Sequence, residues 1–127
     1  MGINPAKMKK DKPIKPAHCI NMLRGISDTQ DLLSGKWKII IIGLLYYGGT
    51  MRFMDLKRAV EGIAPKMLSK ELKDLEMNQL ITRTTRDTRP ISVEYSLTDQ
   101  GKSLNTVLDA MGSWGVRYRH QVVTDAI

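Results

Sequence analysis

The segment from Pro65 to Asn78 constrains the fold more than any other part of the chain. Proline is favoured at the first position of a helix, because its missing amide proton costs nothing there. Three leucines then recur at the spacing of one helix face, at about 3.6 residues per turn: Leu68, Leu72 and Leu75. This pattern predicts an amphipathic helix whose leucines are buried in a core.

The opposite face of this predicted helix is basic. On a helical wheel, Ser69 and the lysines lie about 100 to 200 degrees from Leu68, and these lysines are Lys66, Lys70 and Lys73. Glu71 and Asp74 lie to one side of the stripe, so acidic side chains do not interrupt it. Such a helix can enter a major groove about 12 Å wide and present Lys and Ser to base edges and phosphates. Taken alone, the segment fits equally well an ordinary amphipathic helix with solvated charges.

The segments around this helix predict a helix-turn-helix followed by a wing. Asp55 to Val60 has the pattern of a short helix that ends at Gly62. After the longer helix, Thr82 to Asp87 and Val93 to Thr98 have the alternating, Thr- and Val-rich character of two strands joined by a turn. Arginines suited to phosphates or to a narrow minor groove lie along or beside this hairpin: Arg83, Arg86 and Arg89.

Helices are also predicted on both sides of this unit. Ser27 to Gln30 forms a capping box for a short helix that runs to about Ser34. The run Ile39 to Ile42 suits a buried strand or a buried helix, but the apolar stretch from Lys36 to Tyr47 is long enough to favour a core helix. A brief extended piece is expected at 51–53.

One long C-terminal helix is predicted, beginning at a cap provided by Thr98 or Asp99. It carries apolar residues at helical spacing: Leu104, Val107, Leu108, Met111, Trp114 and Tyr118. These aromatics, with Trp37, Tyr46 and Tyr47, could line an effector pocket at a dimer interface, but we expect them to be core. The predicted fold class is α+β, mainly α.

The length of the chain and the distribution of its charge predict one domain with a basic N-terminal arm. The 127 residues carry a net charge of +7, which makes a polyanion the natural partner. More than half of this excess lies in residues 1–18, which hold five Lys and one Asp. We interpret 1–18 as a flexible basic arm and 19–127 as the folded domain. A basic tail by itself is weak evidence for nucleic-acid binding.

The sequence predicts a cytoplasmic protein that is not an enzyme and holds no metal or cofactor. The lone Cys19 permits no internal disulfide, and no zinc-type spacing is present. The N-terminus lacks the apolar region of a secretory signal, and the apolar run Ile39 to Tyr47 is far shorter than the roughly 20 residues that span a membrane. His18 and His120 accompany no catalytic motif.

Several motifs, in their order along the chain, resemble those of the HxlR-type winged helix-turn-helix regulators. They are Gly35-Lys36-Trp37, Arg52-Phe53 with Leu56, Pro65-Lys66-Met67-Leu68 with Leu72 and Leu75, and Val93-Glu94-Tyr95-Ser96-Leu97-Thr98 with Gly101. The resemblance implies a dimeric bacterial transcription factor that binds double-stranded DNA, with Arg52 added to its DNA-binding residues. It also implies that Ser27 to Ser34 and Leu104 to Tyr118 build the subunit interface.

The chain departs from the family pattern in two places. Ala64 stands where the family commonly has Ser or Thr, which weakens the N-cap of the helix that begins at Pro65 and is predicted to read the DNA, here called the reading helix. Cys19 lies a few residues upstream of a cysteine with which some members sense oxidants or electrophiles. Lys15 and His18 could favour its reactive thiolate, although a free cysteine is also commonly a small buried hydrophobe.

The sequence therefore predicts a homodimeric, sequence-specific DNA-binding regulator, with a helix in the major groove and a wing on the backbone or minor groove. The alternative is a winged-helix module that uses the same face to contact another protein. The stripe of Lys66, Lys70 and Lys73 favours DNA, since a scaffold has no need of three lysines on one face beside an arginine-bearing hairpin.

Overall fold

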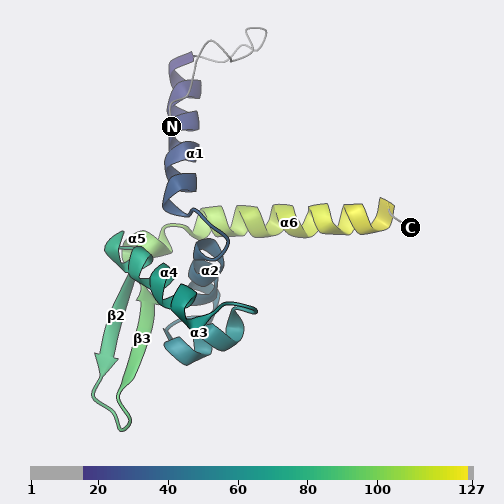
Figure 1. Ribbon diagram of the computed structural model, residues 1–127. Helices are drawn as coiled ribbons and strands as arrows, with labels where there is room; N and C mark the ends of the chain where they lie inside the picture. The colour runs from purple at the N-terminus through teal and green to yellow at the C-terminus, as the bar shows by residue number, and fades with distance from the viewer. Residues whose placement is uncertain (1–15, 126–127) are drawn as a thin grey trace. The chain divides into compact units, whose positions relative to one another are not determined.

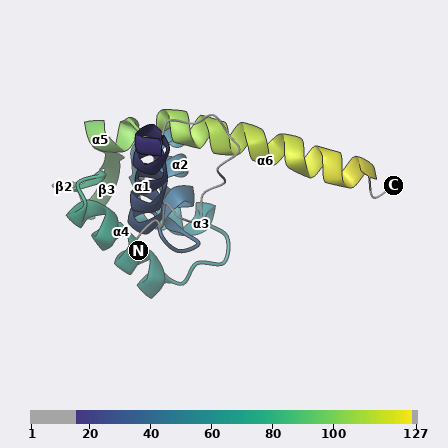
Figure 2. The ribbon, with the colours of Figure 1, turned by 90° about the horizontal axis from the view of Figure 1, so that it is seen from above.

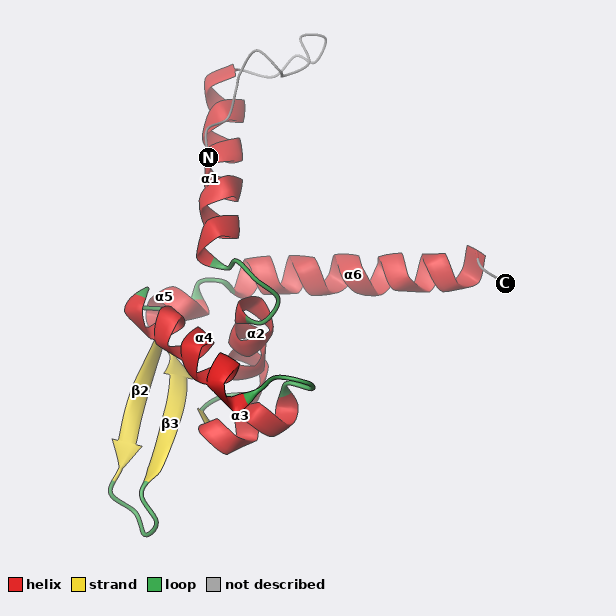
Figure 3. Cartoon of the chain, in the orientation of Figure 1, coloured by secondary structure: helices red, strands yellow, loops and turns green. Residues whose placement is uncertain are grey.

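The fold is known from a computed structural model, which describes residues 16–125. It is mainly helical, with one small antiparallel sheet, as Figure 3 shows. The chain divides into two units, Met1–Gly35 and Lys36–Ile127. Residues 1–15 of the predicted basic arm lie outside the described residues, and the arm's last three residues, 16–18, belong to the first helix. No helix of the described chain is long and apolar enough to cross a membrane.

The first unit contains the helix α1, Pro16–Leu32, which begins well before the predicted start at Ser27. The predicted capping box is therefore wrong, because Ser27 lies in the middle of α1. The nearby hydroxyl of Thr29 instead donates a hydrogen bond to the carbonyl of Gly25 one turn earlier, at 2.8 Å, a local bond that is compatible with a continuing helix. A capping pattern shows where a helix could start, but it does not stop a helix that began upstream.

The core of the second unit is built around α2, Lys38–Gly48. Ile41 and Ile42 are fully buried, which confirms the helical interpretation of the isoleucine run. They pack in a core that includes buried residues of the other helices and of the first long strand: Leu56, Leu68, Leu72, Leu75 and Ile81. The helix ends at Gly48 and is capped by Gly49, whose φ of 78° lies in the left-handed region that glycine adopts without strain.

The predicted helix-turn-helix and wing are both confirmed. α3 spans Phe53–Ala59 and α4 spans Pro65–Met77. The strands β2, Ile81–Arg86, and β3, Ser92–Leu97, form the hairpin, and the short strand β1, Met51–Arg52, pairs with the other edge of β3. Figure 1 shows this hairpin projecting beyond α3 and α4 of the same unit, which is the arrangement of a wing.

The predicted long C-terminal helix is two helices, α5, Asp99–Lys102, and α6, Asn105–Asp125. Thr98 caps α5 as expected, because its hydroxyl accepts a hydrogen bond from the amide of Gly101 at 3.0 Å. The break follows at once: the amide of Leu104 bonds the carbonyl of Gly101, three residues back, at 3.2 Å. A three-residue bond tightens the last turn and ends the α-helical pattern.

The aromatic residues of α6 are not core residues of this chain, contrary to the prediction. Leu108 is buried, but Trp114 and Tyr118 are more than half exposed and stack on each other with ring centroids 5.0 Å apart. Tyr47 is exposed as well, whereas Trp37 and Tyr46 are half-buried. Figure 2 shows the reason: beyond its first turns α6 extends away from the rest of its unit, so no other element of that unit covers it.

Candidate nucleic-acid interface

The helix α4 has the two faces that the sequence predicts. Its three leucines, Leu68, Leu72 and Leu75, are almost completely buried. The polar residues of the opposite stripe are all exposed, namely Lys66, Ser69, Lys70 and Lys73. Hydrophobic burial therefore fixes which side of α4 faces the solvent, and that side is basic.

Two acidic residues of α4, Glu71 and Asp74, pair with a lysine that the sequence did not identify as their partner. The Lys38 ammonium, at the start of α2, lies 2.6 Å from a carboxylate oxygen of Glu71 and 3.5 Å from one of Asp74. Lys38 and Glu71 are both buried. Burial alone lowers the pKa of Lys38, but the hydrogen bonds and charges of Glu71 and Asp74 outweigh it and raise that pKa above its ordinary value.

No sequence signal joins Lys38 to Glu71, because they lie on different helices far apart along the chain. The wheel places Glu71 beside the basic stripe, but the structure turns it inward against α2. Within residues 16–125, the lysines of the stripe form no ion pair of their own. Glu71 and Asp74 are thus held by α2, whereas Glu76, the third carboxylate of α4, is exposed and lines the depression between α4 and the wing. The lysines of the stripe remain available to an external anion.

The arginines of the wing lie on opposite faces of the hairpin. Arg83 pairs in register with Tyr95, and Arg86 pairs with Ser92; residues three apart in a strand point to opposite faces. Arg86 forms an ion pair with Glu94 across the strands at 3.0 Å. Arg83 forms none within the described chain, so the two arginines are not equivalent candidates for DNA contact.

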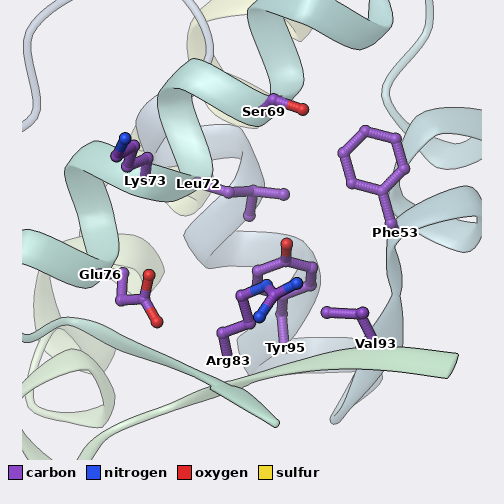
Figure 4. Close-up of a pocket in the computed structure, with 8 residues that line it drawn as sticks. All are labelled: Phe53, Ser69, Leu72, Lys73, Glu76, Arg83, Val93 and Tyr95. Carbon is purple, nitrogen blue, oxygen red and sulfur yellow. The ribbon is translucent and has the colours of Figure 1, made fainter. Parts of the chain in front are cut away.

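Arg83 and α4 share a depression of about 510 Å³ between the reading helix and the wing. Figure 4 shows the side chains that line it: Phe53, Ser69, Leu72, Lys73, Glu76, Arg83, Val93 and Tyr95. The structure therefore brings together Ser69, Lys73 and Arg83, which the sequence could assign only to separate elements. Their hydroxyl, ammonium and guanidinium groups all donate hydrogen bonds, as phosphate recognition requires. The carboxylate of Glu76 lines the same depression, so its charge is mixed.

The remaining candidate residues lie apart from this depression. Arg89 is exposed in the loop between β2 and β3. Arg52 precedes α3, where its guanidinium lies 3.8 Å from Asp55. Ala64 is the N-cap of α4 and makes no side-chain hydrogen bond to the helix, which confirms the weak cap. Cys19 is a free, half-buried residue of α1.

A short helix, a turn, a helix with a basic exposed face and a two-stranded wing define a winged helix-turn-helix protein. Comparison with known families agrees: residues 32–123 match the family described as HxlR-like helix-turn-helix. The chain belongs to this family, and it is a transcriptional regulator of the helix-turn-helix type.

Individual relatives and solved structures are similar over most of the chain. The uncharacterized HTH-type transcriptional regulator YdzF of Bacillus subtilis is 46% identical over 88 residues, which cover 69% of this chain and 81% of YdzF. The reduced form of the redox regulator HypR superposes with a TM-score of 0.71 at 31% identity, over 79% of this chain and 98% of HypR. The reduced form of YodB from Bacillus subtilis superposes with a TM-score of 0.63 at 31% identity, over 71% of this chain and 87% of YodB.

Proposed function

We propose that this chain is a homodimeric regulator that binds double-stranded DNA at specific sequences in the cytoplasm. α4 enters the major groove, and the wing contacts the backbone or the adjacent minor groove. The observation that carries the proposal is the exposed face of α4: its lysines have no acidic partner within the described chain, while two of the three carboxylates of the helix, Glu71 and Asp74, are turned toward Lys38. Arg83 on the neighbouring wing extends this basic surface.

Phosphate contacts and base contacts have different roles in this proposal. Lys and Arg near the backbone supply affinity through released counterions, so binding weakens steeply as salt rises. Side chains that reach base edges supply the sequence preference. Ser69 and Lys70 face outward from the middle of α4 and are the candidates for base contact, whereas Arg89 in the wing loop is a candidate for the backbone.

The homodimer is supported by apolar side chains on α6 that the described chain does not cover. Met111, Trp114, Tyr118 and Val122 recur at helical spacing and are each roughly half exposed. Exposed apolar patches of this kind mark interaction surfaces. In a two-fold dimer the two reading helices would meet half-sites about 34 Å apart, one turn of DNA.

Selection of bound genomic fragments by the purified protein, followed by footprinting and stoichiometry, tests this proposal. We expect a two-fold symmetric site, two chains per duplex and an affinity that falls steeply between low and moderate salt. One asymmetric site saturated by a single chain would contradict the dimeric reading. Binding without any sequence preference would instead favour the protein-interaction module.

Regulation by an oxidant at Cys19 is a second candidate function. It is supported by the similarity to HypR, whose reduced and oxidized forms are both solved, and to YodB, whose diamide-treated form is solved. Since Cys19 is the chain's only cysteine, its thiol could form a disulfide with a small thiol or with the partner's Cys19. The second bond needs the two Cα atoms within about 7 Å.

Operator affinity before and after mild diamide treatment with a small thiol, for the wild type and Cys19→Ser, tests this regulation. We expect the affinity of the wild type to change and that of Cys19→Ser to stay constant. An equal response of the two proteins, or none in either, would remove Cys19 from the mechanism.

A further inference from the structure

We propose that Lys38 is a positioning residue of the DNA interface: it fixes the rotation of α4 and keeps Glu71 and Asp74 of this helix away from the DNA. Lys38 lies at the start of α2 and has no exposed ammonium with which to contact DNA itself. This inference rests on the proposed DNA-binding function. It adds a residue on a different helix that determines how the reading face is presented.

The geometry is that of one cation held between two carboxylates of one helix turn. Glu71 and Asp74 are three residues apart and so lie on the same side of α4. The Lys38 ammonium is 2.6 Å from Glu71 and 3.5 Å from Asp74. Any rotation of α4 about its own axis moves both carboxylates together relative to α2, so the cluster resists rotation in either direction.

The consequence for DNA binding follows from the order of residues in α4. Adjacent positions in a helix are separated by about 100° of rotation. A one-residue rotation would therefore bring Glu71 toward the direction in which Lys70 now points. A carboxylate facing phosphate is repelled, whereas a lysine there is attracted. The orientation of α4 thus decides whether Lys70 or Glu71 faces the groove.

The three buried leucines of α4 hold the helix against the core, but they do not explain why a charged cluster lies beside them. A buried ion pair contributes little net stability compared with well-packed apolar residues, because desolvation offsets the attraction. Loss of one partner, however, leaves a buried carboxylate without compensation. A movement of α4 that exposes Glu71 to solvent would then be favoured. The same movement would displace the exposed lysine face of α4.

Three variants distinguish the orienting role of Lys38 from the simple loss of one positive charge. Lys38→Met removes the cation and leaves Glu71 without its partner. Lys38→Met/Glu71→Met replaces the buried pair by apolar residues of similar size and keeps the net charge of the chain at +7. Lys102→Met removes one positive charge from an exposed residue of α5 and serves as the matched control. Each is measured with an operator selected by the wild type.

We expect Lys38→Met to bind the operator about tenfold more weakly or worse, because the uncompensated Glu71 carboxylate moves toward solvent and turns α4 out of its orientation. The double variant should return to within about twofold of the wild type, since apolar replacement of such a pair is often neutral, and Lys102→Met should also stay within about twofold. The slope of affinity against salt should be unchanged in Lys38→Met, because Lys38 releases no counterion.

Three results would overturn the inference. The first is wild-type affinity in Lys38→Met, and the second is a double variant that has a wild-type Tm and still binds weakly. The third is a salt slope reduced by about one in Lys38→Met, which would mean that Lys38 contacts phosphate directly. If Lys38→Met does not fold, Lys38→Gln takes its place, because its neutral amide keeps a hydrogen-bond donor near Glu71 but removes the cation; wild-type affinity in this variant would overturn the inference. Absence of sequence-specific binding by the wild type would overturn the proposed function together with this inference. Sequence-specific binding by the wild type, with the same operator affinity in Lys38→Met, would overturn this inference and leave the proposed function standing.

Discussion

A β-carbon on Gly101 would lie 2.1 Å from the carbonyl oxygen of Leu80, far inside van der Waals contact. The same carbonyl accepts a hydrogen bond from the amide of Thr98 at 3.0 Å, so it cannot move freely. Only glycine therefore lets α5 approach the residue that precedes β2. This close contact joins the base of the wing to the start of the C-terminal helices.

Gly101→Ala should lower the free energy of unfolding by about 1 to 3 kcal/mol, the usual cost of inserting a methyl group into a filled site. Urea unfolding followed by circular dichroism measures this change. Gly25→Ala is the control, because its β-carbon would meet nothing within 4 Å and alanine is the better helix former. Equal stability of Gly101→Ala and the wild type would show that the contact with Leu80 relaxes without cost.

Lys70→Ala should change the sequence preference of DNA binding, whereas Arg89→Ala should lower the affinity for every sequence. If Lys70 reads a base, its loss should change the order of preferred sequences, by about 1 to 3 kcal/mol at the affected position. Arg89→Ala should weaken all sequences alike and reduce the salt slope by about one, as expected for a phosphate contact. Binding of a randomised operator library at two salt concentrations measures both effects. Full affinity in both variants would favour the protein-interaction module.

Arg83 and Arg86 should contribute unequally to binding, because only Arg86 has an acidic partner in the wing. Arg83→Ala should reduce both affinity and the salt slope, by about one for each lost phosphate contact. Arg86→Ala/Glu94→Ala removes a cation and its own counter-charge, and it should leave the slope unchanged. Affinity titrations across a salt series decide the matter, and a larger loss of slope in the Arg86 and Glu94 variant would reverse this assignment.

The Lys38 cluster should make stability depend on pH in the alkaline range. The folded pKa of Lys38 lies above its ordinary value of 10.5, so its contribution is fully present below pH 10.5 and is lost as the pH rises through the folded pKa. The free energy of unfolding should therefore fall more steeply above this pH in the wild type than in Lys38→Met/Glu71→Met. Urea unfolding from about pH 8 to about pH 12 compares the two, and parallel curves would contradict the prediction.

The order of the winged unit could be predicted from the sequence because its signals are local. The leucines of α4 repeat at helical spacing, Pro65 marks its start, and the alternating residues of β2 and β3 surround a turn. Each pattern depends only on residues a few positions apart. Local rules therefore fix which elements form, in which order, and which face of α4 is apolar.

The tertiary structure decided which groups meet across elements. Neither the approach of Lys38 to Glu71 nor that of Gly101 to Leu80 has a local signal, because each pair is brought together by packing. The same limit explains the aromatic residues of α6: helical spacing places Trp114 and Tyr118 on one face, but it does not say whether another element covers that face. Periodicity defines a surface, whereas burial depends on the elements that pack against it, and those are set by the whole fold.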